Sequence, residues 1–211
     1  MARLRFTISV SLDGFVAGPS PSQEDPLGEG GEQLHEWGFA LEAWRKPHGR
    51  EGGTVTASTA VMEESRANVG AAIMGREMFG GGPGPWGDDP WEGWWGDEPP
   101  FRYPVFVLTH HEREPLVKGE TTFTFVTDGI ESALEQAKAA ADGGDVTIGG
   151  GADVFQQYLA AGLVDELELN VVPVLLGGGT PLFDERTAGV ELEAARAVEA
   201  PGVTHLKYHV R

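Results

Sequence analysis

Apolar and polar side chains alternate over residues 4–10, which is the period of a β-strand with one buried face. The alternation ends at Asp13 and Gly14, residue types that are common in turns. The segment that follows is rich in Pro, Ser, Gly and acidic residues and reaches about residue 32. Long irregular segments in compact domains are often binding loops or lids. We therefore expect a strand that leads into a functional loop.

Further along the chain, short apolar runs alternate with stretches of helical period. A continuous apolar run such as residues 71–74 is typical of a buried parallel strand, and a capping box of Asp128 and Glu131 predicts the start of a helix. His205 and His209 alternate on the last strand and are expected on an exposed face. The pattern predicts an α/β domain with a mainly parallel sheet and an antiparallel edge at the C-terminus. Predicted strands cover residues 4–10, 71–74, 103–108, 121–126, 145–148 and 163–171, with a closing hairpin at 191–194 and 203–210, and predicted helices cover about 33–44, 58–69, 128–142 and 152–161.

The composition narrows the class of protein. At 211 residues, of which 40% are hydrophobic, the chain is expected to fold as one domain over residues 1–211. A net charge of −18 disfavours nucleic-acid binding, which normally requires clustered Lys and Arg. The absence of Cys excludes disulfides, thiolate metal sites and a Cys nucleophile. Because the N-terminal apolar run is unlike a signal peptide and no segment is long enough to span a bilayer, we expect a soluble, cytoplasmic protein without a membrane partner.

Residues 148–155 are the stretch with the clearest chemistry. An apolar run reaches Ile148, three glycines follow from Gly149 to Gly151, and a helical pattern starts at Ala152. Glycines let a ligand approach the backbone, and the first amides of a helix are unpaired donors that favour an anion. An ordinary tight turn is the alternative, since the full G-x-G-x-x-G fingerprint is not present.

Two other predicted strands end in polar groups. Gly75 and Arg76 follow one strand, and Thr109, His110 and His111 follow the next. An arginine fork suits phosphate, although a surface pair with a carboxylate is an equally good interpretation of Arg76 alone. A metal site at the two histidines is disfavoured because no other His lies nearby in the sequence. Since ligands bind at the C-terminal ends of parallel strands, these ends are expected to converge with the glycine turn.

Residues 80–100 form a Gly/Pro/Trp-rich insert. It includes Trp86 and Trp91 as well as two further tryptophans. Aromatic rings offer flat contact surfaces, so Trp86 and Trp91 are candidates for stacking against a heterocyclic substrate. Packing against the fold or a contact between subunits is the favoured alternative.

In this order, the motifs resemble the dihydrofolate reductase-like superfamily, and in particular the branch related to the C-terminal reductase domain of the bifunctional riboflavin-biosynthesis deaminase/reductase. The matching motifs are residues 11–17, 74–76, 148–152, 163–167 and 173–177. The resemblance runs from about residue 3 to residue 210. It implies a three-layer fold with helices on both faces of the sheet, and a homodimer that uses the sheet edge near residues 167–176.

The resemblance also implies an activity. It predicts an NADPH-dependent reductase that transfers hydride to a pteridine- or pyrimidine-type heterocycle, closer to 5-amino-6-(5-phosphoribosylamino)uracil reductase than to dihydrofolate reductase. A nucleotide-binding or sensing protein without catalysis is the alternative, since fold does not fix function. By position, the cofactor contacts are Gly149, Gly150, Gly151 and Ala152 for the pyrophosphate, Gly75 and Arg76 for the phosphates, Thr109, His110 and His111 for the 2′-phosphate region, and Val16 and Ala17 for the nicotinamide.

The resemblance is weakest around the substrate. Asp13 falls near the reacting end and is the candidate catalytic and substrate-binding residue, with a turn role as the alternative. Where the riboflavin-pathway reductases typically have a Pro-x-Leu-Thr-x-Arg run, this chain has the insert at about 80–100. Where the folate enzymes have a carboxylate, this chain has Thr59. We therefore expect a poor dihydrofolate reductase.

Overall fold

The computed structural model describes residues 2–211, which form two compact units. Unit 1 consists of the chain up to Phe6 together with residues 68–164, and unit 2 consists of residues 7–67 and 165–211. Strand β1 (Leu4–Ser11) contributes its first residues to unit 1 and the rest to unit 2. The expectation of one domain over residues 1–211 stays a prediction. Within residues 2–211, no helix has the length and apolar character needed to cross a bilayer.

Unit 1 is built on a parallel sheet. The start of β1 pairs with β7, β7 with β3, β3 with β4 and β4 with β6, all in parallel, and the short β5 runs antiparallel to β6. Strand β3 is a nearly continuous buried apolar run, as expected for a strand covered on both faces. The strands are β3 (Val69–Gly75), β4 (Val105–Leu108), β5 (Leu116–Lys118), β6 (Thr121–Val126) and β7 (Asp145–Ile148).

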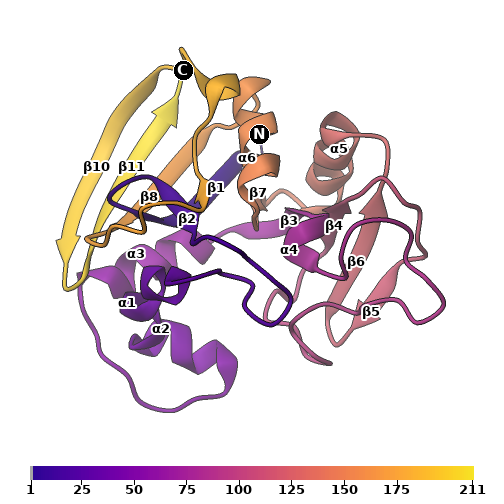
Figure 1. Ribbon diagram of the computed structural model, residues 1–211, viewed down its shortest axis with the longest axis horizontal. Helices are drawn as coiled ribbons and strands as arrows, with labels where there is room; N and C mark the ends of the chain where they lie inside the picture. The colour runs from indigo at the N-terminus through magenta and orange to yellow at the C-terminus, as the bar shows by residue number, and fades with distance from the viewer. Residues whose placement is uncertain (1) are drawn as a thin grey trace. The chain divides into compact units, whose positions relative to one another are not determined.

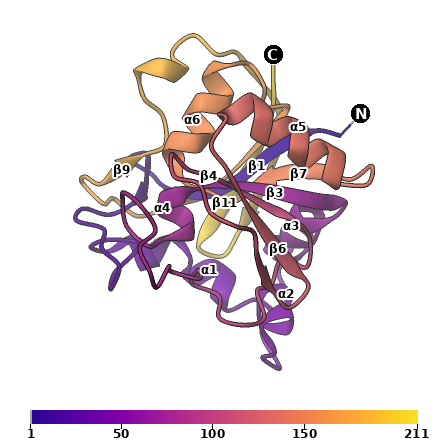
Figure 2. The ribbon, with the colours of Figure 1, turned by 90° about the vertical axis from the view of Figure 1, so that its right-hand side faces the viewer.

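Two helices cover one face of this sheet. Figure 2 shows α5 (Ile130–Ala140) and α6 (Ala152–Ala160) side by side over β7, β3 and β4, and α4 (Arg76–Phe79) is a single turn after β3. The predicted capping box of α5 is wrong. Its N-cap is Gly129, with φ of 92°, so Asp128 lies one residue too early, and no side-chain hydrogen bond caps α5 within the described chain.

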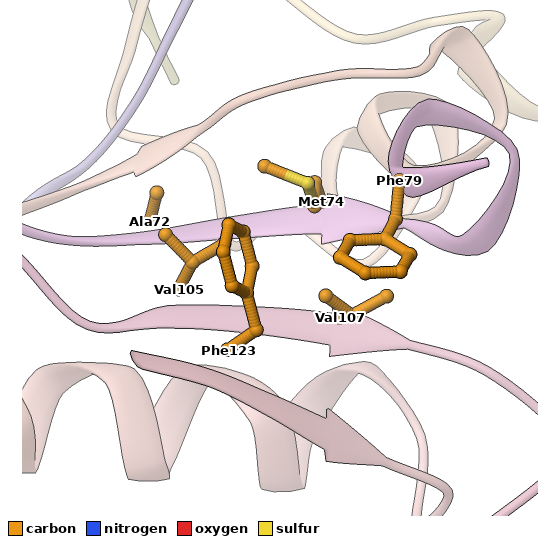
Figure 3. Close-up of a cluster of buried hydrophobic side chains, with 6 residues drawn as sticks. All are labelled: Ala72, Met74, Phe79, Val105, Val107 and Phe123. Carbon is orange, nitrogen blue, oxygen red and sulfur yellow. The ribbon is translucent and has the colours of Figure 1, made fainter. Parts of the chain in front are cut away.

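A buried cluster joins alternate residues of β3 and β4 to the rings of Phe79 and Phe123, whose centroids are 5.3 Å apart (Figure 3). Trp86, Trp91 and Trp95, all from the predicted insert, pack against this cluster. The expectation that tryptophans of the insert cover the fold is therefore confirmed for these three. The cluster consists of Ala72, Met74, Phe79, Val105, Val107 and Phe123.

In unit 2, β10 runs antiparallel to β11 and β11 runs antiparallel to β8, and β1 is the next strand in the order β10-β11-β8-β1. Figure 1 shows β10 and β11 as a long hairpin beside β8. Helix α3 (Ala57–Arg66) packs on β10. The strands are β8 (Glu166–Val172), β10 (Leu192–Ala200), β11 (Val203–Val210) and the small antiparallel pair β2 (Phe15–Ala17) and β9 (Thr180–Pro181).

The long helix predicted at residues 33–44 is replaced by several short ones. Leu41 has an extended backbone, with φ of −78° and ψ of 141°, which ends one helical stretch and caps the next. The short helices are η1 (Gly31–Leu34), α1 (Glu36–Phe39), α2 (Glu42–Arg45) and η2 (Lys46–His48), and η3 (Glu185–Thr187) follows β9. With its mainly parallel sheet, its helices and its antiparallel C-terminal strands, the chain has the predicted α/β fold.

Candidate functional site

The ends of three neighbouring strands meet in unit 1, as the sequence predicts. Strand β3 lies between β7 and β4, so Gly149 after β7, Gly75 at the end of β3 and Thr109 after β4 lie at the same edge of the sheet. The glycine turn is tied to β3 by two backbone hydrogen bonds. Gly149 N donates to Ile73 O at 2.7 Å, and Gly75 N donates to Gly150 O at 2.9 Å.

Glycine is required at Gly75, at the end of β3, and at Gly150 in the turn, whereas Gly151 lies next to open space. A Cβ atom on Gly75 would lie 2.8 Å from Cγ2 of Val154, and Gly150 has φ of 115°, which side chains rarely allow. A Cβ atom on Gly151 would meet no described atom within 4 Å. Helix α6 begins at Ala152, and its N-cap, Gly151, makes no side-chain capping hydrogen bond among residues 2–211. The first amides of α6 are therefore donors next to open space, which suits an anion.

Arg76 stands directly after β3, and the insert surrounds its guanidinium. Its Nε donates to Gly82 O at 3.1 Å and one Nη donates to Gly81 O at 3.2 Å. The other, Nη1, is buried and has no hydrogen-bond partner among the described residues. Buried polar groups are nearly always paired, so this orphan donor is unusual. It is the kind of group that a bound anion satisfies.

A second arginine reinforces the positive charge. The Trp86 ring has the Arg76 Cζ atom 2.9 Å from its centroid and the Arg113 Cζ atom 4.7 Å away. Arg113 donates to Trp91 O at 2.5 Å. Burial lowers the pKa of both arginines, and the charge of Arg113 lowers the pKa of Arg76 further. Neither arginine makes an ion pair among the described residues, although the charge of Glu92 acts on Arg113, so two guanidinium groups lie together beside Trp86.

The third strand end is held by a turn of its own side chains. Thr109 is buried, and its Oγ1 accepts a hydrogen bond from His111 N at 3.2 Å. Its backbone N donates to Val126 O at 3.0 Å, which fixes the strand end against β6. His110 is exposed and His111 is half-buried. Within residues 2–211, no group of three or more metal-ligating side chains comes together.

Trp86 and Trp91 have structural contacts. Trp86 Nε1 donates to His111 O at 2.9 Å, and Trp91 Nε1 donates to Phe79 O at 2.9 Å. Their rings pack against the core of unit 1. A role of these two rings in substrate binding stays a prediction.

Asp13 lies in unit 2 and holds a loop. Its carboxylate accepts from Leu176 N at 3.1 Å and from Gly177 N at 2.7 Å. A hydrogen bond from Ser11 and these two amides lower the pKa of Asp13. These two contacts tie Asp13 to the loop at Leu176 and Gly177, and both the catalytic role and the turn role of Asp13 stay predictions. Val16 and Ala17 lie on β2, where Ala17 pairs with Thr180 of β9.

The sequence analysis missed a buried polar cluster in unit 2. His205 was expected on an exposed face, and this expectation is wrong because only 1% of it is exposed. Its Nε2 lies 2.8 Å from Ser58 Oγ and its Nδ1 lies 2.6 Å from Asn170 Oδ1. The period of two places His205 on the same face of its strand as His209, but it does not show that Ser58 of α3 reaches His205. His209, on the same strand, is exposed as expected.

Comparisons with known proteins agree with this geometry. A protein of Shewanella sp. PV-4, provisionally assigned to riboflavin biosynthesis, has a TM-score of 0.65 at 23% identity, covering 100% of this chain and 99% of its own. Dihydrofolate reductase of Enterococcus faecalis, solved with NADP(H), has a TM-score of 0.52 at 15% identity, covering 99% and 96%. The uncharacterized protein YyaP of Bacillus subtilis (strain 168) is 33% identical over 86 residues, 40% of this chain and 45% of YyaP. The chain spans less than half the length of the curated relatives it matches.

Fold and strand ends together define a protein of the dihydrofolate reductase-like class. Within this class, the chain belongs to the RibD C-terminal domain family, whose model matches residues 2–206. This is the family that the resemblance implied.

Proposed function

We propose that the chain is an NADPH-dependent reductase that transfers hydride to a pteridine- or pyrimidine-type heterocycle. Family membership supports a reductase, and 5-amino-6-(5-phosphoribosylamino)uracil is the kind of substrate that the riboflavin pathway provides. The observation that carries the cofactor assignment is the buried, unpartnered Nη1 of Arg76, the residue that follows Gly75, whose backbone is bonded to the open glycine turn. A dinucleotide phosphate would supply the acceptors that both features lack.

The candidate residues of unit 1 are assigned contacts in this proposal. Gly149–Ala152 bind the pyrophosphate, with the amides of residues 150–152 as the donors, because Gly149 N donates to Ile73 O and a Cβ at Gly151 would meet only open space. Arg76 binds a phosphate oxygen through Nη1, and its other nitrogens stay on Gly81 and Gly82. NADPH, when bound, supplies the hydride.

The remaining cofactor contacts are carried by two further segments. Thr109, His110 and His111 line the 2′-phosphate region in this proposal, with the Thr109 turn fixing the backbone of His111. Val16 and Ala17 border the nicotinamide in this proposal. The small size of Ala17 fits a close approach of a ring to the backbone of β2.

Replacing Arg76 by Ala is expected to weaken NADPH binding by about 10- to 100-fold, roughly 1.5–3 kcal/mol, because a charge-assisted hydrogen bond is lost. We assign this bond to the 2′-phosphate, which NADH lacks, so NADH binding should change little. Isothermal titration with both cofactors measures this. Arg102→Ala is the matched control, since this exposed arginine of unit 1 pairs only with exposed Glu120 and its loss changes the net charge equally. Equal losses for both cofactors in R76A would contradict the NADPH assignment.

We further propose a homodimer, the commonest symmetric assembly of soluble proteins. The region expected near residues 167–176 includes most of β8, which is not a free sheet edge because it is bordered by both β11 and β1. The free edge in unit 2 is β10, most of whose residues are exposed. Light scattering at micromolar concentration should give twice the chain mass. A mass equal to one chain would rule the dimer out.

A further inference from the structure

Met78, on the single-turn helix α4, lies against the glycine turn of the proposed cofactor site. A Cβ atom on Gly150 would lie 3.2 Å from the Sδ atom of Met78 and 3.3 Å from its Cγ atom, so the thioether borders the backbone of Gly150. Gly75 N donates to Gly150 O at 2.9 Å, which joins the turn to the end of β3, and Trp94 Nε1 donates to Met78 O at 2.9 Å. The backbone on both sides of the thioether is therefore held in place.

Met78 is also the methionine that solvent reaches. The exposed fraction is 38% for Met78, against 9% for Met62 and 0% for Met74, and these are the methionines within residues 2–211. Met74 approaches the turn as well, at Gly149, but it is fully buried. The chain contains no Cys, so an oxidant finds no thiol here. Among the described residues, the sulfur atom of Met78 is therefore the most accessible to a dissolved peroxide.

Oxidation of this thioether would change the chemistry of the turn. Hydrogen peroxide transfers one oxygen atom to the sulfur: the O–O bond breaks, an S–O bond forms, and water leaves. The sulfur loses two electrons and the peroxide gains them. The product, methionine sulfoxide, is polar where the thioether was apolar. Its oxygen is a hydrogen-bond acceptor, and it would stand beside the amides of residues 150–152, which the proposed function assigns to the pyrophosphate.

We propose that Met78 is a site of reversible oxidation that controls cofactor binding, because its sulfoxide oxygen competes with the diphosphate of NADPH for the amides of the glycine turn. The proposal rests on the proposed function and adds a means of regulation to the same site. A methionine sulfoxide reductase, with a dithiol as the electron donor, restores the thioether and releases water while the dithiol becomes a disulfide. Cofactor affinity therefore falls under peroxide and returns on reduction.

The test measures NADPH binding before and after treatment with hydrogen peroxide. Mass spectrometry of peptides establishes when Met78 has gained one oxygen atom, and isothermal titration then gives the affinity. Oxidised native protein should bind NADPH about tenfold more weakly, the scale of one lost hydrogen bond. Treatment with a methionine sulfoxide reductase and dithiothreitol should restore the original affinity. Oxidised Met78 with unchanged NADPH affinity would overturn the proposal.

Met78→Leu is the decisive variant, because leucine has a similar volume and no sulfur. Compared with itself before and after peroxide, it should keep its NADPH affinity to within about twofold, although it retains the buried methionines. Met62→Leu is the matched control, which should lose affinity on oxidation as the native protein does. An equal loss in M78L and the native protein would assign the effect to another residue and overturn the proposal.

Bound NADPH should in turn protect Met78. If the diphosphate occupies the turn, NADPH at ten times its dissociation constant leaves roughly a tenth of the protein free, so oxidation of Met78 should slow about tenfold. The rate is measured from the mass of the Met78 peptide over time, with the oxidation of free methionine in the same solution as the reference. Oxidation of Met78 at the same rate with and without NADPH would place the thioether away from the bound diphosphate and overturn the proposal.

The same titrations separate this proposal from the proposed function. Native protein that binds NADPH equally well before and after oxidation of Met78 leaves the reductase standing and rejects the regulation. Native protein that does not bind NADPH in either form rejects the cofactor, and inorganic pyrophosphate then decides about the turn. Weaker pyrophosphate binding after oxidation in the native protein, but not in M78L, would support control by Met78. No binding of pyrophosphate, or equal binding in both forms, would overturn it.

Discussion

Lowering the pH from 7 to 4 is expected to cost the folded protein about 3 kcal/mol through His205 alone. Burial lowers the pKa of this imidazole to about 4, against an ordinary value of 6.5. The unfolded chain therefore binds a proton at His205 between these two pH values, and the folded chain does not. The contribution of His205 to the free energy of unfolding should fall as the pH drops from about 6.5 to about 4. It should change little at lower pH.

The surroundings of His205 explain why its neutral form is required. Asn170 Oδ1 accepts a hydrogen bond from the Nδ1–H group, and Ser58 can donate to Nε2 only while that nitrogen is unprotonated. Trp37 closes the site, with its ring centroid 5.0 Å from that of His205. Protonation would break the hydrogen bond from Ser58 and leave a buried charge, because only 1% of His205 is exposed.

Urea unfolding at pH 7, 6, 5 and 4 measures this effect, with the native protein compared with His205→Gln. The variant should show a shallower loss of stability over this range, because it has no imidazole at position 205. His209→Gln is the matched control, since His209 lies on the same strand and is exposed. Carboxylates such as Glu64, whose pKa is lowered to about 2, also lose stabilising contacts in acid, but equally in all three proteins. An unchanged slope in H205Q would show that His205 does not carry the effect.

Local patterns predicted the strands and the strand-end motifs well. Strands β6 and β7 have the predicted bounds, and the three strand ends that the sequence singled out do meet at one edge of unit 1. This succeeds because period and glycine placement are local signals, and because parallel strands bring their C-terminal ends together. The helix at residues 33–44 failed because the extended backbone of Leu41 interrupts an otherwise helical pattern.

The environment of the key side chains could not be predicted in the same way. Arg76 is wrapped by carbonyls of Gly81 and Gly82 and covered by Trp86, all from a segment without periodicity. Glu168 and His205 are buried because α3 lies over the polar face of the sheet. Ser58 and His205, which form one of the contacts there, are more than a hundred positions apart in the chain. Sequence patterns report which face is polar, but only the fold decides whether solvent reaches it.

Turnover of dihydrofolate is expected to be at least about 10²-fold below an ordinary enzyme rate of roughly 10 per second. The resemblance places Thr59 at about the position where the folate enzymes have their carboxylate, and the Thr59 hydroxyl is engaged in the cap of α3. Its Oγ1 accepts from Thr56 N at 3.0 Å, and Thr56 caps the helix in return. The group that protonates the pterin in those enzymes is therefore replaced by a neutral structural residue.

The neighbouring glutamates do not replace the missing acid. Hydrogen bonds from Arg196 and Lys207 lower the pKa of Glu64 to about 2, so it stays ionised at neutral pH. Glu63 is exposed on α3. General acid catalysis requires a pKa near the working pH, and Glu64 does not meet this condition. Asp13, the remaining candidate, has a lowered pKa and holds two backbone amides.

The turnover is measured as the loss of NADPH absorbance with dihydrofolate as the acceptor. Native protein, Glu63→Gln and Asp13→Asn should all be slow, since none of these carboxylates is placed to donate a proton to the pterin. A turnover of roughly 10 per second in the native protein, abolished in E63Q, would assign the acid to Glu63 and contradict this expectation. The same rate abolished only in D13N would instead establish the catalytic role predicted for Asp13. A low rate in all three, with NADPH bound normally by each, is the result expected for a reductase whose acceptor is a different heterocycle.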